Sequence, residues 1–208
     1  MTTLLHIACS PRAQSESAAG ARVFLDRFRQ ANPDWEIDAM DLWREPLPEF
    51  TDALLEAKYA RLAGHAFTDA QRDGFAAAER LALRVSRAER VLISTPMWNF
   101  SIPYKLKHWF DVIVQPGLTF RFDPAHGYLP LLADRPTVAI VASGSDYVTG
   151  MNRGRIDMAT PYLREALRFI GIADVRFILI GPTAGPAEPI CTARAAAHRR
   201  LAAIAASF

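Results

Sequence analysis

Short apolar segments alternate along this chain with longer segments of helical period. Four continuous apolar runs predict strands that are buried on both faces, because each is short and is bounded by polar or turn-forming residues. These runs are residues 3–9, 90–95, 137–142 and 175–180. Residues 35–41 predict a fifth strand, since apolar side chains occupy every second position there.

The segments between these strands place apolar residues three and four positions apart, which predicts helices with one buried face. In the first helix, for example, Ala21, Phe24 and Phe28 fall on one side. Gly171 is expected to end the helix that precedes the last strand. The predicted helices are residues 17–31, 51–63, 68–86, 102–114, 160–170 and 192–206, and residues 117–123 are expected to be extended.

This alternation predicts an α/β fold with a parallel sheet and helices on both faces. Five strands suit the flavodoxin-like order of the doubly wound class. The chain has 208 residues, of which 50% are hydrophobic, which is enough for one sizeable core. We therefore expect a single domain over residues 1–208.

Composition excludes several classes of function. The formal net charge of +2 lacks the strong basic field that nucleic-acid binding requires, so no nucleic-acid partner is expected. No apolar run approaches the ~18 residues of a membrane helix, and no secretory signal is evident at the start of the chain. Cys9 and Cys191 belong to no Cys/His cluster, so no metal site is expected, and a reducing, cytoplasmic location fits.

Ligands of open parallel sheets bind at the carboxyl ends of the strands, which directs attention to the loops after residues 9, 95 and 142. The first loop carries Ser10, Ser15 and Ser17 ahead of a helix. Hydroxyls and free helix amides favour an anion such as phosphate, although neither GxxxxGK[ST] nor GxGxxG is present. Helix capping by Ser15 or Ser17 is the alternative explanation.

Cys9 lies directly before this loop and raises the possibility of a thiolate-dependent phosphatase. That chemistry needs an arginine six residues after the cysteine, and Ser15 occupies this position. We therefore expect Cys9 to be a small buried residue.

The second loop is unusually apolar for a loop, because Met97, Trp98 and Phe100 follow a strand end directly. These side chains could cover a flat ring while Asn99 and the backbone bond its polar edge. The alternative is that they pack against a neighbouring helix or a second subunit.

The third loop is small and polar, and it would allow the backbone to approach a ligand closely. It consists of Ser143, Gly144, Ser145, Asp146 and Tyr147. No motif for a nucleophile with its base is present, so no catalytic side chain is expected. A pocket for a planar cofactor without acid–base machinery indicates chemistry carried by the cofactor itself.

At these loops the sequence resembles the FMN-dependent NADH-azoreductases, which are also described as NADH:quinone oxidoreductases. The resemblance is carried by the serines of residues 10–17, by TPMWNFSIPYKLKHWFD at 95–111, by GLTFRF at 117–122 and by TPYLREALRFIGIADVRFI at 160–178. These segments lie in the family's order and cover nearly the whole chain. The aromatic stretch is the specific part of the match.

The resemblance implies an FMN enzyme that passes two electrons from NADH or NADPH to quinones and azo compounds by a ping-pong mechanism. It further implies a homodimer in which Phe122 reaches over the flavin of the other subunit, where Phe100 and Phe122 contact the substrate. The FMN phosphate would be held by Ser10, Ser15, Glu16 and Ser17, and the ring by Met97, Trp98, Asn99, Phe100, Ser143, Gly144, Ser145 and Asp146.

Two positions depart from the family's pattern. Glu16 replaces the glutamine of its Ser-Gln-Ser loop, and a carboxylate near a phosphate is unfavourable unless it points away. The family's Ser-Arg-Gly-Gly turn here lacks its arginine and gains Asp146, which is expected to disfavour an anionic reduced flavin and to lower its potential. Two alternatives stay open: a flavodoxin-like electron carrier without NAD(P)H turnover, and a flavin-free binding domain that kept the fold.

Overall fold

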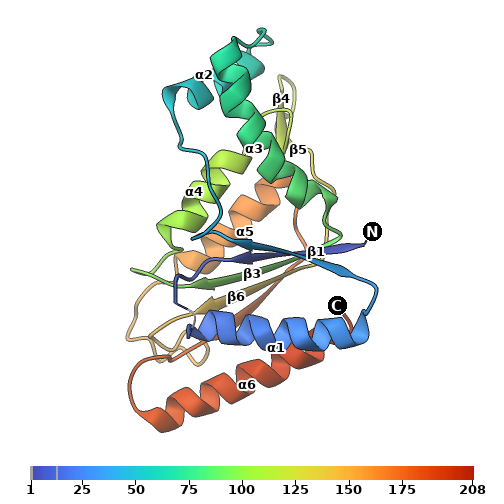
Figure 1. Ribbon diagram of the computed structural model, residues 1–208. Helices are drawn as coiled ribbons and strands as arrows, with labels where there is room; N and C mark the ends of the chain where they lie inside the picture. Colours follow the sequence, from blue (N-terminus) through green and yellow to red (C-terminus); the bar gives the residue numbers. More distant parts are fainter. Residues whose placement is uncertain (1, 13) are drawn as a thin grey trace.

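A twisted sheet of five strands separates two layers of helices in the computed structural model, which describes residues 2–12 and 14–208 (Figure 1). All neighbouring strands in this sheet are parallel, and their order is β2-β1-β3-β6-β7. The predicted flavodoxin-like arrangement is confirmed, with the change of direction between β1 and β3. The strands are β1 (Thr3–Ala8), β2 (Glu36–Asp41), β3 (Arg90–Pro96), β6 (Thr137–Ala142) and β7 (Val175–Ile180).

Helices cover both faces of the sheet because successive side chains of the inner strands point in opposite directions. Leu4 of β1 packs with Phe24 and Phe28 below the sheet, whereas Leu5 packs with Trp109 on the other side. α1 (Glu16–Ala31) and α6 (Ala187–Ala205) form one layer, and α3 (Asp69–Arg87), α4 (Tyr104–Ile113) and α5 (Ala159–Ile170) form the other (Figure 1). α2 (Asp52–Leu62) packs on α3, farther from the sheet.

The structure differs from the sequence prediction at two elements. The extended segment at 117–123 is half of an antiparallel hairpin, β4 (Phe120–Asp123) with β5 (Gly127–Pro130). The last helix begins at Ala187 and not at residue 192, because Pro189 lies in the first turn, where no N–H is required. Within the described residues, no helix has the length and apolar content needed to cross a membrane.

Gly171 ends α5, as predicted, in the left-handed region with φ of 111°. A Cβ at this position would lie 2.2 Å from the carbonyl oxygen of Leu132. The backbone therefore requires glycine here for two reasons, its conformation and its close approach to the chain after β5.

Gly171→Ala is expected to lower the free energy of unfolding by about 2 kcal/mol or more, since it adds a steric clash to an unfavourable φ. Urea denaturation measures this loss. The matched control is Gly64→Ala, which has φ of 73° and nothing within 4 Å of the added methyl group. We expect the control to lose about 1 kcal/mol. Equal losses in the two variants would contradict the role assigned to Leu132.

Candidate functional site

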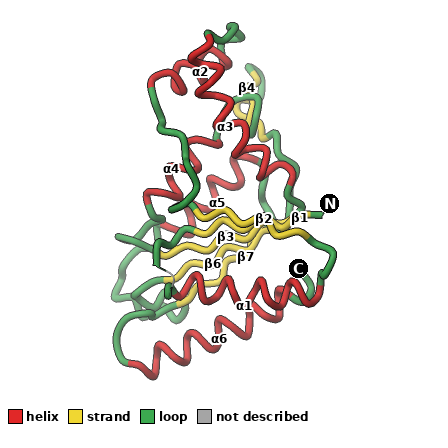
Figure 2. The backbone as a smooth tube through the Cα atoms, viewed as in Figure 1, coloured by secondary structure: helices red, strands yellow, loops and turns green. Residues whose placement is uncertain are grey.

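The loops after β1, β3 and β6 meet at one edge of the sheet, where the strands end together (Figure 2). Backbone hydrogen bonds fix the first residue of each loop. Cys9 N donates to Ser94 O at 2.9 Å, Met97 N donates to Ala142 O at 2.7 Å, and Ser143 N donates to Ile180 O at 2.9 Å. The three loops that the sequence singled out therefore start from rigid positions.

The serines of the first loop form a buried polar pair at the N-terminus of α1. Ser15 caps the helix, because its Oγ accepts a hydrogen bond from Ala18 N at 3.0 Å. Its hydroxyl lies 3.2 Å from that of Ser17, and both side chains are buried. One hydroxyl hydrogen joins the pair, so among the described residues the other remains for an acceptor such as a phosphate oxygen. Ser10 is half-buried at the start of the loop and accepts from Arg12 N at 3.3 Å.

The carboxylate of Glu16 turns toward α6. Arg194 forms a bidentate ion pair with it: Nε donates to Oε2 at 2.8 Å, and Nη2 donates to Oε1. The hydrogen bond raises the pKa of Arg194. The negative charge that replaces the glutamine of the resembling family is thus paired with a cation from another helix, and Glu16 can offer the serine loop its backbone amide.

Cys9 is fully buried, as predicted, and its burial raises the pKa of the thiol. A thiolate nucleophile is therefore disfavoured at this position. His6, on β1 shortly before Cys9, is also unsuited to proton transfer. Burial lowers its pKa to about 4, and its ring nitrogen lies 2.9 Å from Ser94 Oγ.

The second loop contains a tight, strained turn. Trp98 and Ser101 exchange backbone hydrogen bonds of 2.8 and 3.0 Å, and both residues between them have positive φ, 47° at Asn99 and 73° at Phe100. Two successive positive φ values define a type I′ turn, which asparagine tolerates and phenylalanine does not favour. Strain of this kind is retained where function requires it.

The two aromatic side chains of this turn have different surroundings. Trp98 packs against Trp43, with ring centroids 5.8 Å apart, so the packing alternative describes part of its role. Phe100 is 47% exposed and has no ring partner among the described residues. Trp43 was missed by the sequence analysis, because it lies after β2 in a segment without a motif.

A cavity of about 310 Å³ opens between the second and third loops. It brings together predicted residues from both loops, including Tyr147 at the end of the third loop, and it adds Arg155, which sequence reasoning missed. Its lining consists of Met97, Asn99, Phe100, Ser143, Gly144, Ser145, Tyr147 and Arg155. Trp98 lies outside this lining and instead contributes to a neighbouring cavity of about 490 Å³, which also includes Asn99.

Asp146 does not line the cavity between the loops. Its carboxylate accepts hydrogen bonds from the hydroxyl of Thr149 and from the backbone N–H groups of Thr149 and Val148, both at 2.9 Å. The hydroxyl bond contributes most to lowering the pKa of Asp146. The side chain closes its own turn and borders a separate cavity beside α6. Its predicted contact with the ring stays a prediction.

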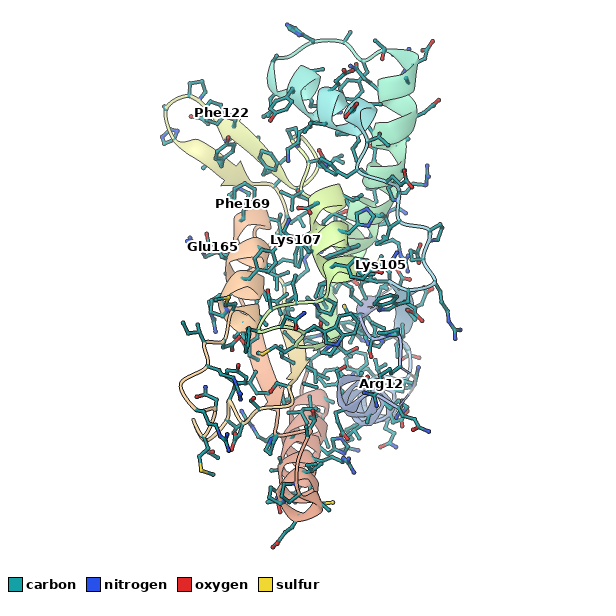
Figure 3. The ribbon with its side chains drawn as sticks, turned by 90° about the vertical axis from the view of Figure 1, so that its left-hand side faces the viewer. Arg12, Lys105, Lys107, Phe122, Glu165 and Phe169 are labelled. Atoms are coloured by element: carbon teal, nitrogen blue, oxygen red, sulfur yellow. The ribbon has the colours of Figure 1, made fainter. Side chains whose placement is uncertain are left out.

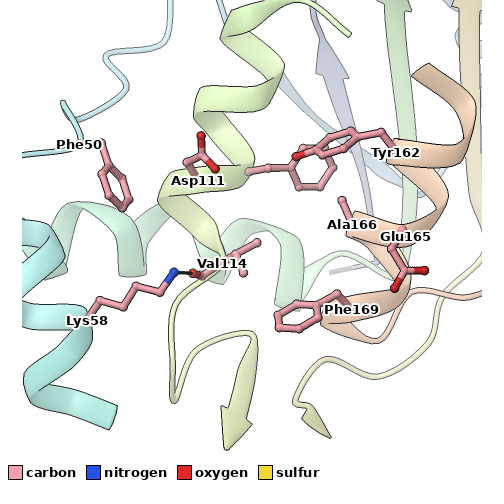
Figure 4. A pocket seen from close by; sticks show the side chains of 9 residues that line it. Phe50, Lys58, Asp111, Val114, Tyr162, Glu165, Ala166 and Phe169 are labelled. Carbon is pink, nitrogen blue, oxygen red and sulfur yellow. Dashed lines mark hydrogen bonds between the residues drawn. The ribbon is translucent and has the colours of Figure 1, made fainter. Parts of the chain in front are cut away.

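Phe122 is far from the other predicted residues. It lies on the β4–β5 hairpin and is 52% exposed, and Figure 3 shows it well away from Arg12 of the first loop. The structure therefore does not bring Phe122 to the cavity of its own chain. Below the hairpin, a further cavity of about 310 Å³ lies between α2, α4 and α5 and includes Phe50 and Phe169 (Figure 4).

The residues present fit FMN on two observations. The first loop offers a phosphate a buried hydroxyl pair and a helix N-terminus, and the Glu16 carboxylate beside it is paired with Arg194. The cavity between the second and third loops offers a flat ring the apolar side chains of Met97 and Phe100 on one side and the small polar third loop on the other. The described residues contain no group of acidic, His or Cys side chains placed to hold a metal ion.

Comparison with known proteins gives a consistent family. A model of the flavodoxin-like fold matches residues 2–204. FMN-dependent NADH:quinone oxidoreductase 1 of Bradyrhizobium diazoefficiens is 74% identical over 208 residues, which is 100% of both chains. FMN-dependent NADH:quinone oxidoreductase 3 of Pseudomonas fluorescens is 38% identical over 206 residues and covers 97% of this chain and 95% of its own.

Solved structures share the fold. The azoreductase from Bacillus anthracis strain Sterne superimposes with a TM-score of 0.89 at 23% identity and covers 100% of both chains. An FMN-dependent NADH-azoreductase from Bacillus anthracis in complex with FMN has a TM-score of 0.82 at 24% identity, and covers 99% of this chain and 100% of its own.

Arg194→Ala is expected to weaken FMN binding roughly threefold, because the freed Glu16 carboxylate then lies near the phosphate; an exposed pair contributes only modestly. Quenching of FMN fluorescence by the apoprotein measures the Kd. The double variant Glu16→Gln/Arg194→Ala is expected to regain the original affinity. A double variant as weak as Arg194→Ala alone would show that Arg194 acts independently of Glu16.

Proposed function

The chain belongs to the family of FMN-dependent NADH:quinone oxidoreductases, which have the flavodoxin-like fold, and on this premise we propose that it passes two electrons from NADH to quinones, with azo compounds as further acceptors. The observation that carries the proposal is the convergence of the buried serine pair and the strained aromatic turn at one edge of the sheet. When bound, FMN accepts the two electrons from NADH and delivers them to the acceptor.

Different loops bind the phosphate and the ring of the cofactor. Ser10, Ser15 and Ser17 hold its phosphate, assisted by the backbone amide of Glu16 and the dipole of α1. Met97, Asn99 and Phe100 form one wall for the ring, with Trp98 packed behind the turn. Ser143, Gly144 and Ser145 form the other wall, and Asp146 closes the turn that follows.

Donor and acceptor use the same cavity in turn. The described residues around it include no carboxylate or imidazole placed to transfer a proton, so the protein's contribution is to hold two flat rings in contact and to exclude water. One shared cavity requires NADH to be released as its oxidised form before the acceptor enters. This order gives ping-pong kinetics.

A second copy of the chain completes the site. Phe122 stands on an exposed hairpin, remote from its own cavity (Figure 3), and Phe100 is exposed in the turn. Burial of these aromatic side chains in a symmetric dimer removes them from water and allows Phe122 to close the cavity of the partner. Both cysteines are free thiols, which supports a cytoplasmic location.

The first test of the function is the visible spectrum of the purified protein after FMN is added and free flavin is removed. We expect retained yellow flavin that bleaches when NADH is added without oxygen and recovers when a quinone follows. Initial rates at several fixed quinone concentrations should give parallel double-reciprocal lines.

Each other result contradicts a specific part of the proposal. Flavin that stays oxidised with NADH indicates the electron carrier. No retained flavin indicates a binding domain without cofactor. Intersecting lines indicate separate sites for donor and acceptor.

Phe122→Ala is expected to lower kcat/KM for a quinone roughly fivefold, the loss of one aromatic contact, without changing the Kd for FMN. Its action across the dimer can be tested by mixing. Ser15→Asp keeps a capping side chain but places a carboxylate at the phosphate site, so it should bind no FMN. In mixed dimers with Phe122→Ala, the Ser15→Asp chain supplies an intact Phe122 to the only FMN site.

Recovery of activity per bound FMN in the mixed dimers is expected. Activity that stays at the level of Phe122→Ala alone would place Phe122 in its own chain's site or outside both sites. A monomer in analytical sedimentation would contradict the proposal that two subunits form each site.

A further inference from the structure

Arg155 is the one charged side chain that lines the cavity between the second and third loops. Its Nη1 donates to Ser145 Oγ at 3.3 Å, which directs the guanidinium onto the third loop. Among the described residues, no carboxylate lies within ion-pair distance of it. The charge of Arg155 is therefore not neutralised by the protein.

The backbone holds Arg155 in this place. Arg155 N donates to Asn152 O at 3.2 Å, and Gly154 N donates to Asn152 Oδ1 at 3.1 Å, so residues 152–155 form a closed turn. Arg153 and Gly154 have φ of 57° and 73°. This turn reverses the chain and points Arg155 back to the cavity.

The same segment is attached to the site at its far end. Met158 N donates to Phe100 O at 2.9 Å, which ties it to the strained aromatic turn. The carboxylate of Asp157 accepts from Ala159 N and Thr160 N, both at 2.9 Å, which fixes the start of α5. Arg155 is therefore held between two anchored points and does not extend from a free loop.

The acidic groups of the first and third loops make their contacts away from Arg155. Glu16 is paired with Arg194, and the Asp146 carboxylate is engaged by its own turn and lies outside the cavity lining. Gly144 occupies the position where the resembling family carries an arginine. The cavity thus regains a cation from a segment farther along the chain.

We propose that Arg155 stabilises the negative charge that FMN gains on reduction, and thereby sets the reduction potential of the bound cofactor. The inference rests on the proposed function, because it requires FMN in this cavity. A fixed positive charge beside the polar edge of the ring favours the reduced form over the oxidised form. Arg155 would in this way replace in function the arginine that the third loop lacks.

The test compares Arg155→Gln with Arg153→Gln, which removes the same charge two residues away on the same turn but outside the cavity lining. The midpoint potential of bound FMN is measured anaerobically against reference dyes, and the Kd for oxidised FMN is measured by fluorescence. In Arg155→Gln, the equilibrium constant for reduction of the bound FMN should be about tenfold smaller than in the unaltered protein. This corresponds to a midpoint potential lower by about 30 mV for two electrons. Arg153→Gln and the charge-conserving Arg155→Lys should stay near the original potential.

The outcomes separate this inference from the proposed function. If the unaltered protein binds FMN and is reduced by NADH while Arg155→Gln matches Arg153→Gln, the role of Arg155 is overturned and the proposed function stands. If Arg155→Gln no longer holds oxidised FMN, Arg155 serves binding and the inference about the potential is wrong. If the unaltered protein retains no FMN, both proposals fall.

Discussion

The hydrogen-bonded register of β1, β3 and β6 determines where every functional loop begins. Ala8 pairs with Ser94, and Pro96 pairs with Ala142, so the three strands end side by side. The order of the strands reverses between β1 and β3, and the helices that follow them leave on opposite faces (Figure 1). The space between the first and second loops therefore opens at the edge of the sheet, which is where such folds bind their ligands. The serine pair, the aromatic turn and the third loop depend on this one constraint.

The charge at that edge of the sheet depends on which loop carboxylates find partners elsewhere in the fold, and not on the sequence of the loops alone. A carboxylate next to a phosphate would be costly in a partly buried site, and the Glu16 carboxylate is instead paired with Arg194 of α6. The Asp146 carboxylate accepts its hydrogen bonds from Val148 and Thr149 of its own turn. Only Arg155 keeps an uncompensated charge in the cavity lining. The sequence predicts two new negative charges at the site, whereas in the folded protein the one charged side chain that lines the cavity is an arginine.

The parts of the fold that sequence predicts are those with strong local patterns. The buried strands are continuous apolar runs, and the left-handed end of α5 needs glycine. The second strand of the hairpin, β5, is short and half exposed, so it has no clear sequence pattern. The sequence places the start of α6 too late, because a proline in the first turn of a helix resembles a loop residue.

The same distinction holds at the site. The serines and the aromatic turn are adjacent to strand ends, so their place follows from the topology. Arg155 and Ser145 are ten residues apart, and Arg194 and Glu16 are 178 residues apart, and neither contact has a repeating pattern that could reveal it. Trp43 was missed for the same reason, since its contact with Trp98 exists only after the sheet has formed.

The strained aromatic turn links the shape of the site to its charge. A phenylalanine at φ of 73° costs about 1 kcal/mol, and the paired hydrogen bonds between Trp98 and Ser101 hold it there. The carbonyl of Phe100 also binds Met158, which ends the segment that carries Arg155. A shift of residues 152–158 would therefore move the aromatic wall and the cation together. This coupling explains how the third loop can lack an arginine while the cavity retains a fixed positive charge: the segment that fixes the turn also supplies the cation.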